Sequence, residues 1–148
     1  MPELSAAFDW LPGQWDLCRT ISGAGTMAGK AEFSRRTPGV LHYLETGDLS
    51  LHSGYVGKAY REYFYRLEED HIHVSFADAA PGERTFLRLR PAAGDPGGHL
   101  QAHDTHHCGS DVYAATYGFE SAVRVVITIQ VTGSKKDYVI RTVLTRQR

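Results

Sequence analysis

Hydrophobic and polar residues alternate along much of this chain. In QWDLCRTI, residues 14–21, one set of alternate positions holds Trp15, Leu17, Arg19 and Ile21, and the other set is mostly polar. A period of two is that of a β-strand, whose successive side chains point to opposite faces. The set that begins at Trp15 is therefore predicted to face the core.

Short runs rich in alternating, β-branched and aromatic residues recur along the rest of the chain. Turn-forming residues separate them, as in SGAG, TPG and TGSKK. The sequence thus predicts about ten strands, within residues 14–21, 26–36, 41–50, 55–67, 71–77, 84–90, 99–104, 111–120, 123–131 and 137–145.

Helical patterning is confined to PELSAAFDWL, residues 2–11. Many short strands without helices between them are typical of an antiparallel all-β protein, either a sandwich or an up-and-down barrel. Closure of the sheet is favoured because it removes exposed strand edges. In addition, Gly29 and Gly57 occupy inward positions, where a missing side chain lets a strand bend sharply. We predict one domain, residues 1–148, with a short N-terminal helix and a barrel of about ten strands.

Charge and composition narrow the possible partners. The chain has a formal net charge of −1 and scattered basic residues, so no basic surface for nucleic acid is expected. No segment approaches the roughly 18 apolar residues of a membrane span, and the first ten residues hold acids where a secretion signal carries lysines. Cys18 and Cys108 are too few for a disulfide framework. These features predict a cytoplasmic protein with reduced thiols.

Three charged residues, Arg19, Glu45 and Arg61, fall at positions predicted to face inward. A buried charge needs an ion pair or hydrogen bonds, because leaving it alone is strongly destabilising. Glu45 can pair with one arginine, and the pattern does not decide which. The other guanidinium would then be free to bind a carboxylate, phosphate or enolate of a ligand in two-pronged fashion.

A second polar cluster lies in HDTHHCGSDVYAATY, residues 103–117. Alternation places His106 with Cys108 before the turn, and Asp111 with Tyr113 after it. They can equally be turn and core residues without a further role. If they converge with the tyrosines of residues 55–67, the predicted ligand-binding residues are Arg19, Glu45, Arg61, Tyr63, His106, Cys108, Asp111 and Tyr113.

This set of residues is compatible with two main functions. The favoured one is binding of a small, mostly hydrophobic ligand with an acidic group, because an aromatic barrel interior with few polar groups suits such a molecule. The alternative is a cofactor-independent lyase or isomerase, with Asp111 or His106 as base, Tyr113 as acid and Arg61 stabilising an oxyanion. Whether the chain is an enzyme stays open, as does a reactive pairing of Cys108 with His106.

A metal or haem site is the lesser alternative. The segment HDTHHC contains residue types that can bind a metal ion. However, adjacent side chains of a strand point in different directions, and no second motif completes the ligand set. His71 and His73 share one face, which is predicted to be the outer, solvated one. No metal and no cofactor are therefore predicted. Tyr60 and Phe64 point outward in this pattern and leave a homodimer open.

Gly13-Gln14-Trp15, after the predicted helix, resembles the opening of the calycins, which include lipocalins, fatty-acid-binding proteins and nitrobindins. The resemblance implies that Trp15 plugs the barrel floor and that an arginine of the last strand, Arg141 or Arg146, stacks on its indole. Nitrobindins continue with a glycine-rich stretch after the tryptophan, whereas this chain has DLC. That departure disfavours haem.

A resemblance over nearly the whole chain rests on LPGQW, LHYLETG, YREYFYR and KKDYVIRT, and on the His106, Cys108, Asp111 and Tyr113 positions. In these motifs the chain resembles an uncharacterised bacterial family, known only as a domain of unknown function. The resemblance implies a lipocalin-like barrel and carries no activity with it.

Overall fold

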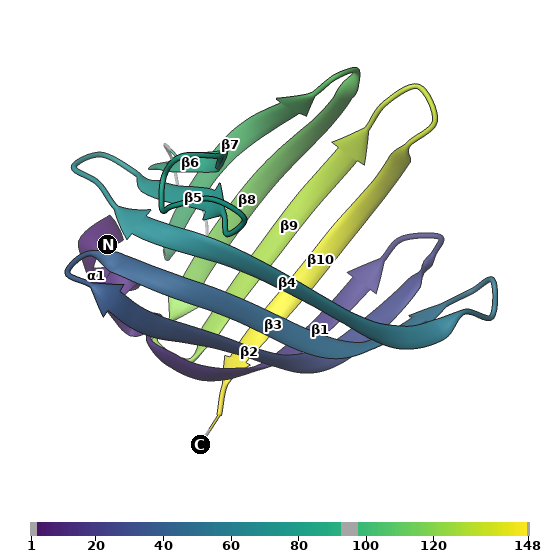
Figure 1. Cartoon of the computed structure of the whole chain (residues 1–148), viewed down its shortest axis with the longest axis horizontal. Coiled ribbons are helices and arrows are strands. Elements are labelled where there is room, and N and C mark those ends of the chain that lie inside the picture. The colour runs from purple at the N-terminus through teal and green to yellow at the C-terminus, as the bar shows by residue number, and fades with distance from the viewer. Residues whose placement is uncertain (1–2, 93–97, 148) are drawn as a thin grey trace.

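Ten antiparallel strands close into a barrel that follows one short helix (Figure 1). The structure is a computed structural model that describes residues 3–92 and 98–147. Each strand pairs with its neighbours in chain order, and β1 pairs with β10 to close the sheet. The elements are α1 (Leu4–Trp10), β1 (Gly13–Ile21), β2 (Gly25–Thr37), β3 (Val40–Leu51), β4 (Val56–Leu67), β5 (Ile72–Phe76), β6 (Thr85–Pro91), β7 (Leu100–Cys108), β8 (Asp111–Ser121), β9 (Arg124–Thr132) and β10 (Asp137–Arg146).

The predicted all-β barrel with a short N-terminal helix is therefore confirmed, and the sandwich alternative is not the architecture formed. The inward set of β1 is buried as its alternation predicts, with Trp15, Leu17 and Arg19 inside and the residues between them exposed. The helical pattern allowed a start at Pro2 or Ser5, and Pro2 lies outside the described residues. In the structure α1 starts at Leu4.

Two facing glycines let β2 and β3 approach closely. Gly29 lies opposite Gly47, and a Cβ on Gly29 would lie 2.0 Å from the carbonyl oxygen of Thr46. Gly29 is therefore required for the close approach of β2 and β3, and its predicted role in strand bending stays a prediction. Gly57 has a different reason to be small, because a Cβ there would meet the side-chain hydroxyl of Tyr55 at 2.5 Å.

The barrel floor is built around Trp15. This side chain is fully buried, and its indole Nε1 donates a hydrogen bond of 2.9 Å to the carbonyl oxygen of Leu11. The guanidinium of Arg146 lies over the indole ring, 4.3 Å from its centroid, a favourable contact between a cation and an aromatic face. Arg146 is therefore the arginine that stacks on Trp15. Arg141, the other candidate, is exposed.

The Gly13 that precedes this tryptophan makes room for Arg146. A Cβ on Gly13 would lie 2.8 Å from Nη1 of Arg146, and the φ angle of Gly13 is 124°, a value that other residues rarely adopt. The same guanidinium donates hydrogen bonds to the carbonyl oxygens of Pro12 and Ala122, at 3.1 and 2.9 Å. Gly13 and Trp15 therefore belong to one set of contacts, in which Arg146 of β10 is bound to the start of β1.

The barrel wall is incomplete along one side, because β5 and β6 are short. Strand β4 pairs with β5 only from Tyr63 to Leu67, and the pairing of β6 with β7 involves Arg90 and Pro91 alone. In Figure 1 these two short strands lie beside one end of the long β4. The Val56–Glu62 half of β4 consequently has no strand partner on that side within the described residues.

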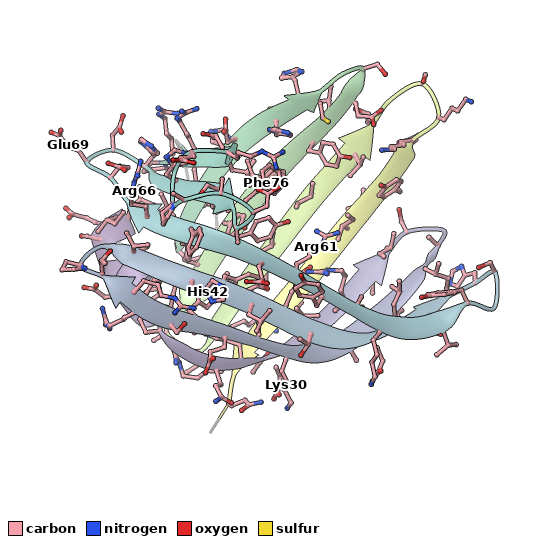
Figure 2. All side chains as sticks on the ribbon, in the orientation of Figure 1. Lys30, His42, Arg61, Arg66, Glu69 and Phe76 are labelled. Carbon is pink, nitrogen blue, oxygen red and sulfur yellow. The ribbon has the colours of Figure 1, made fainter. Side chains whose placement is uncertain are left out.

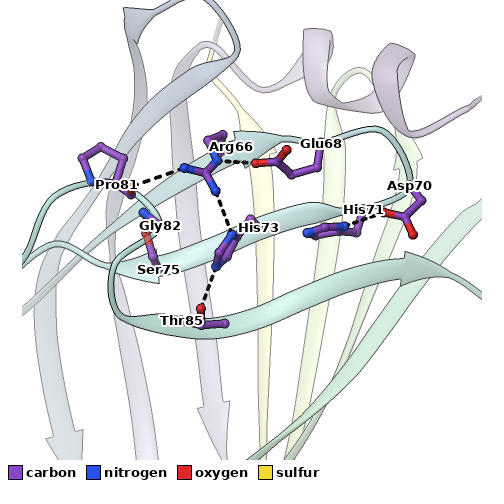
Figure 3. A network of polar contacts seen from close by, with 9 residues as sticks. All are labelled: Arg66, Glu68, Asp70, His71, His73, Ser75, Pro81, Gly82 and Thr85. Atoms are coloured by element: carbon purple, nitrogen blue, oxygen red, sulfur yellow. Dashed lines mark hydrogen bonds and ion pairs between the residues drawn. The ribbon is translucent and has the colours of Figure 1, made fainter.

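His73, on β5, is held in a polar network beneath the turn of residues 77–84 (Figure 3). It was predicted to be solvated, but its side chain is only 5% exposed. Nδ1 of His73 lies 3.3 Å from Nη2 of Arg66, and Nε2 lies 2.8 Å from Oγ1 of Thr85. Since a guanidinium can only donate, Nδ1 accepts, so the neutral ring carries its proton on Nε2. Arg66 also donates to the carbonyl oxygen of Pro81, which ties the turn to the barrel.

We expect this network to make the protein less stable in mild acid. Burial, followed by the charges of Arg88, Arg66 and His71, lowers the pKa of His73, and Glu68 opposes them only weakly. A histidine whose pKa is lowered by folding stabilises the fold fully above its unfolded pKa of about 6.5. That stabilisation is lost as the pH falls through 6.5 toward the lower folded pKa. Urea unfolding between pH 8 and pH 5 should therefore show a declining free energy of unfolding.

The control for this expectation is His73→Gln, which removes the titrating group and keeps a polar side chain. Its free energy of unfolding should change less between pH 7 and pH 5 than that of the unmodified protein. An equal change in both proteins would show that His73 is not responsible.

Candidate ligand-binding site

A buried ion pair crosses the barrel interior between β1 and β3. Arg19 donates to both carboxylate oxygens of Glu45, with Nη1 2.7 Å from Oε2 and Nη2 2.9 Å from Oε1. Both residues are almost fully buried, at 7% and 2% exposure. The two planar groups therefore form the two-pronged geometry in which each charge neutralises the other. Glu45 therefore pairs with Arg19 and not with Arg61, a question that the sequence pattern left open.

Other buried groups complete this pair. Tyr43 donates its hydroxyl to Oε1 of Glu45 at 2.7 Å, and Nε of Arg19 donates to Oγ1 of Thr142 at 2.8 Å. Burial, together with the negative charge of Glu45, raises the pKa of Tyr43 well above its usual value. Burial disfavours the charged guanidinium of Arg19, but the hydrogen bonds and charge of Glu45 outweigh it, so the pKa of Arg19 is raised. Arg19 is thus fully engaged.

Arg61, which was predicted to face inward beside them, is instead exposed, because β5 does not cover this half of β4, and it has no such partner in the described part of the chain. It faces Glu45 across the β3–β4 register, yet within the described residues it forms no hydrogen bond or ion pair. Its side chain lines the inner cavity, and it also lines a groove of about 350 Å³ outside it. Figure 2 labels Arg61 on β4, in the half of the strand that β5 does not cover. A guanidinium at this position is available to an anion.

The groove beside Arg61 follows the incomplete side of the wall. Its other lining residues are Tyr60 and Glu62 of β4, Phe76 at the end of β5, and Ala77 and Asp78 in the turn that follows. The guanidinium of Arg84 lies 5.3 Å from the centroid of the Phe76 ring and is paired with Asp78, while Glu62 contacts His42. The groove thus combines apolar surface, two carboxylates that already have partners, and the guanidinium of Arg61, which is unpaired among the described residues.

Aromatic side chains pack together next to this groove. Tyr63 stacks on Phe86 with ring centroids 5.6 Å apart, and Phe76 lies 5.2 Å from Phe86. His106 approaches Phe86 at 5.2 Å and Tyr113 at 6.1 Å. Of the predicted site residues, Tyr63, His106 and Tyr113 are therefore brought together. Neither ring nitrogen of His106 forms a hydrogen bond within residues 3–92 and 98–147.

The interior beneath these rings is nearly full. The cavity among Arg19, Glu45, Arg61 and their neighbours has a volume of about 20 Å³, and one water needs about 10–15 Å³ of such space. Tyr65 and Tyr117 fill much of the core and share a hydrogen bond of 2.7 Å between their hydroxyls. Burial raises the pKa of both, so each stays protonated. Among the described residues, this cavity is therefore too small for the whole ligand that the sequence led us to expect there.

The remaining predicted residues lie at the open end of β7 and β8. Asp111 accepts a hydrogen bond of 2.8 Å from Nζ of Lys136, and the hydroxyl of Tyr113 lies 3.4 Å from the same nitrogen. These contacts raise the pKa of Lys136. Cys108 is exposed at the end of β7. The structure therefore does not bring Cys108 or Asp111 to the groove beside Arg61.

Sequence reasoning missed Tyr43, Thr142, Phe76, Phe86 and Lys136. Tyr43 and Thr142 were detectable, because they fall on the inward sets of β3 and β10. Phe86 was harder, since a register shift after Val74 alters the pairing of β5 with β6. Lys136 lies in the turn before β10, where no periodicity applies.

Two further observations concern metal sites and membrane-spanning helices. Within the described ranges, no group of three or more His, Cys, Asp or Glu side chains lies close enough together to hold a metal ion. Over the same residues, α1 is the single helix, and no helix has the length and apolarity needed to cross a membrane.

The fold and the site define a lipocalin-like, ten-stranded antiparallel barrel with a free guanidinium at an opening in its wall. A family model matches residues 11–146, and the chain belongs to that family, DUF6314, a family of unknown function. The predicted family and fold are thereby confirmed. No curated protein matches the chain.

Solved structures with the same architecture have very different sequences. The S-type phycobiliprotein lyase CPES from Guillardia theta is 9% identical with a TM-score of 0.62, over 99% of this chain and 94% of that one. The EF1p2_mFAP2b protein, solved with DFHBI bound, is 14% identical with a TM-score of 0.52, over 98% and 100% of the two chains. A redesigned β-barrel, mFAP1, also bound to DFHBI, is 15% identical with a TM-score of 0.49, over 95% and 98%. The first two likenesses show the fold.

Proposed function

We propose that this protein binds one small, mostly apolar molecule with an anionic group, in the groove beside Arg61. The observation that carries the proposal is the pairing of Glu45 with Arg19. It leaves Arg61, an exposed arginine at the opening of the wall, without an ion-pair partner among the described residues. Its guanidinium can donate two parallel hydrogen bonds to a carboxylate or phosphate, and Phe76 lines the same groove.

The dimensions of the groove support a small ligand. Its volume of about 350 Å³ lies at the lower end of the range of roughly 300–1,000 Å³ that is usual for ligand sites. Phe76 supplies an aromatic wall, and Tyr63 and Phe86 lie behind it. The anionic group would contact Arg61 while the apolar part packs on Phe76. The 20 Å³ cavity beneath is too small for the ligand and can hold a water.

The alternative, a cofactor-independent lyase or isomerase, has less support. It needs an acid or base next to a space where substrate can react. Asp111 is engaged by Lys136, and the rings around His106 pack against one another. Binding is therefore the function that the arrangement supports best.

An NMR titration with naphthalene-2-carboxylate tests the proposal. We expect the largest shifts in the amide signals of residues 60–62 and 76–78, which line the groove. We also expect Arg61→Gln to weaken binding about tenfold or more, since a charge-assisted hydrogen bond contributes about 1.5–3 kcal/mol. Arg141→Gln, which removes an exposed arginine of β10, is the matched control and should bind as the unmodified protein does. Shifts elsewhere, or equal binding by both variants, would contradict the proposal.

A further inference from the structure

The free half of β4 and the residue before it carry most of the large hydrophobic side chains that are exposed among the described residues. Of the four large hydrophobic side chains that are exposed within the described residues, three are Tyr55, Val56 and Tyr60, at 55%, 71% and 66% exposure. They lie within six consecutive residues, where β4 lacks a neighbour on the β5 side. An unpaired strand with exposed apolar side chains is a template for pairing with another strand.

Backbone geometry defines which groups this edge offers. The amide of Leu67 donates to Gly39, and the carbonyl oxygen of Tyr55 accepts from Leu51, so the odd-numbered residues of β4 direct their backbone groups toward β3. Backbone direction alternates along an antiparallel strand. The N–H and C=O groups of Val56, Lys58, Tyr60 and Glu62 therefore point to the free edge.

These four residues are arranged so that the strand can pair with itself. We propose that two copies of this chain form a dimer by antiparallel pairing of their free β4 edges, about a two-fold axis at Ala59. That register uses all four residues of each copy, with Tyr60 opposite Lys58 of the second copy and Val56 opposite Glu62 of the second copy. Lys58 and Glu62 of the two copies become diagonal neighbours on one face, within reach of long side chains.

Steric and electrostatic features favour a second copy over an unrelated strand. On the inner face the register brings Ala59 opposite Ala59 of the second copy, so no bulky side chains collide there. Lys58 already contacts Asp48, and Glu62 contacts His42, but both partners belong to β3 and leave the free edge accessible. The register places two Lys58–Glu62 diagonal contacts of opposite charge against one Lys58–Lys58 contact, so the net charge interaction between two identical strands is attractive.

Dimerisation would also affect the groove beside Arg61. Tyr60, Arg61 and Glu62 line that groove, so a second copy on this edge covers it. Dimer formation and anion binding should therefore exclude each other. The dimer does not depend on the proposed binding function, because it rests on the edge alone and is measured without any ligand.

Sedimentation equilibrium over a wide concentration range tests the dimer. For the full chain we expect a mass that rises from 16.4 kDa toward twice that value. Tyr60→Pro removes an edge donor that β3 does not use, so we expect it to keep the thermal midpoint of the fold and to stay monomeric. A monomeric full chain at all concentrations, or dimerisation of Tyr60→Pro as strong as that of the unmodified chain, would overturn the proposal.

A charge exchange provides a second test that does not depend on the proline variant. Lys58→Glu and Glu62→Lys each place like charges across the interface, and each should weaken the dimer about tenfold. The double variant Lys58→Glu with Glu62→Lys restores opposite charges and should recover most of the affinity. Failure of the double variant to dimerise better than both single variants would also overturn the proposal.

Discussion

Replacing Glu45 with alanine is expected to lower the free energy of unfolding by about 3–5 kcal/mol, because it leaves the buried guanidinium of Arg19 without its counter-charge. The hydroxyl of Tyr43 loses its acceptor in the same change. Urea unfolding at pH 7, followed by tryptophan fluorescence, measures the difference. A decrease in the free energy of unfolding of less than about 1 kcal/mol would show that this ion pair contributes no more than an exposed, solvent-screened pair does.

The matched control is Asp48→Ala, on the same strand. Asp48 pairs with Lys58, but both side chains are exposed, and exposed pairs typically contribute about 0–1 kcal/mol. A second control replaces both buried charges, as Arg19→Met with Glu45→Leu. Since this pair of changes leaves no charge unpaired, the double variant should be clearly more stable than Glu45→Ala.

Trp15→Ala is expected to have an effect of similar size, with a loss of about 3–5 kcal/mol in the free energy of unfolding. The substitution empties the barrel floor and removes the hydrogen bond to Leu11. It also removes the ring beneath the guanidinium of Arg146. Thermal or urea unfolding of the variant, followed by circular dichroism, checks this expectation.

A double-mutant cycle separates the contact with Arg146 from the cavity. Arg146→Met should destabilise the fold, whereas Arg141→Met, at an exposed position on the same strand, should change stability by less than about 0.5 kcal/mol. The effects of Trp15→Ala and Arg146→Met should not add, because the two side chains touch. Strict additivity would show that the stacked pair contributes nothing of its own.

The sequence was sufficient to predict the strands and most of the side chains that face inward, but Arg61, which was also predicted inward, is exposed. In a strand with one buried face, the hydrophobic pattern has the same period of two as the side chains themselves. Trp15, Arg19 and Glu45 were therefore correctly predicted to lie inside. The glycine–tryptophan opening predicted an arginine partner for Trp15. It could not decide between Arg141 and Arg146, because that choice depends on how far the last strand is shifted along β1.

The filled interior and the incomplete wall were not predictable in the same way. Alternation shows that side chains point inward, but the cavity volume depends on how Tyr65, Tyr117 and their neighbours interdigitate. The gap beside β4 results from the end of β5 at Phe76, which pairs with Tyr63 and leaves the rest of β4 uncovered. Sequence patterns report strand length poorly. The groove beside Arg61 therefore emerged only from the three-dimensional arrangement.

The most direct test of the central claim, that Arg61 is the free receptor for an anion, compares two probes on two proteins. Calorimetry measures the affinities of naphthalene-2-carboxylate and of its uncharged amide, naphthalene-2-carboxamide, for the unmodified chain and for Arg61→Gln. We expect the unmodified chain to prefer the carboxylate by about tenfold or more, and the variant to lose that preference while binding the amide as before. An equal preference for the carboxylate in both proteins would contradict the claim.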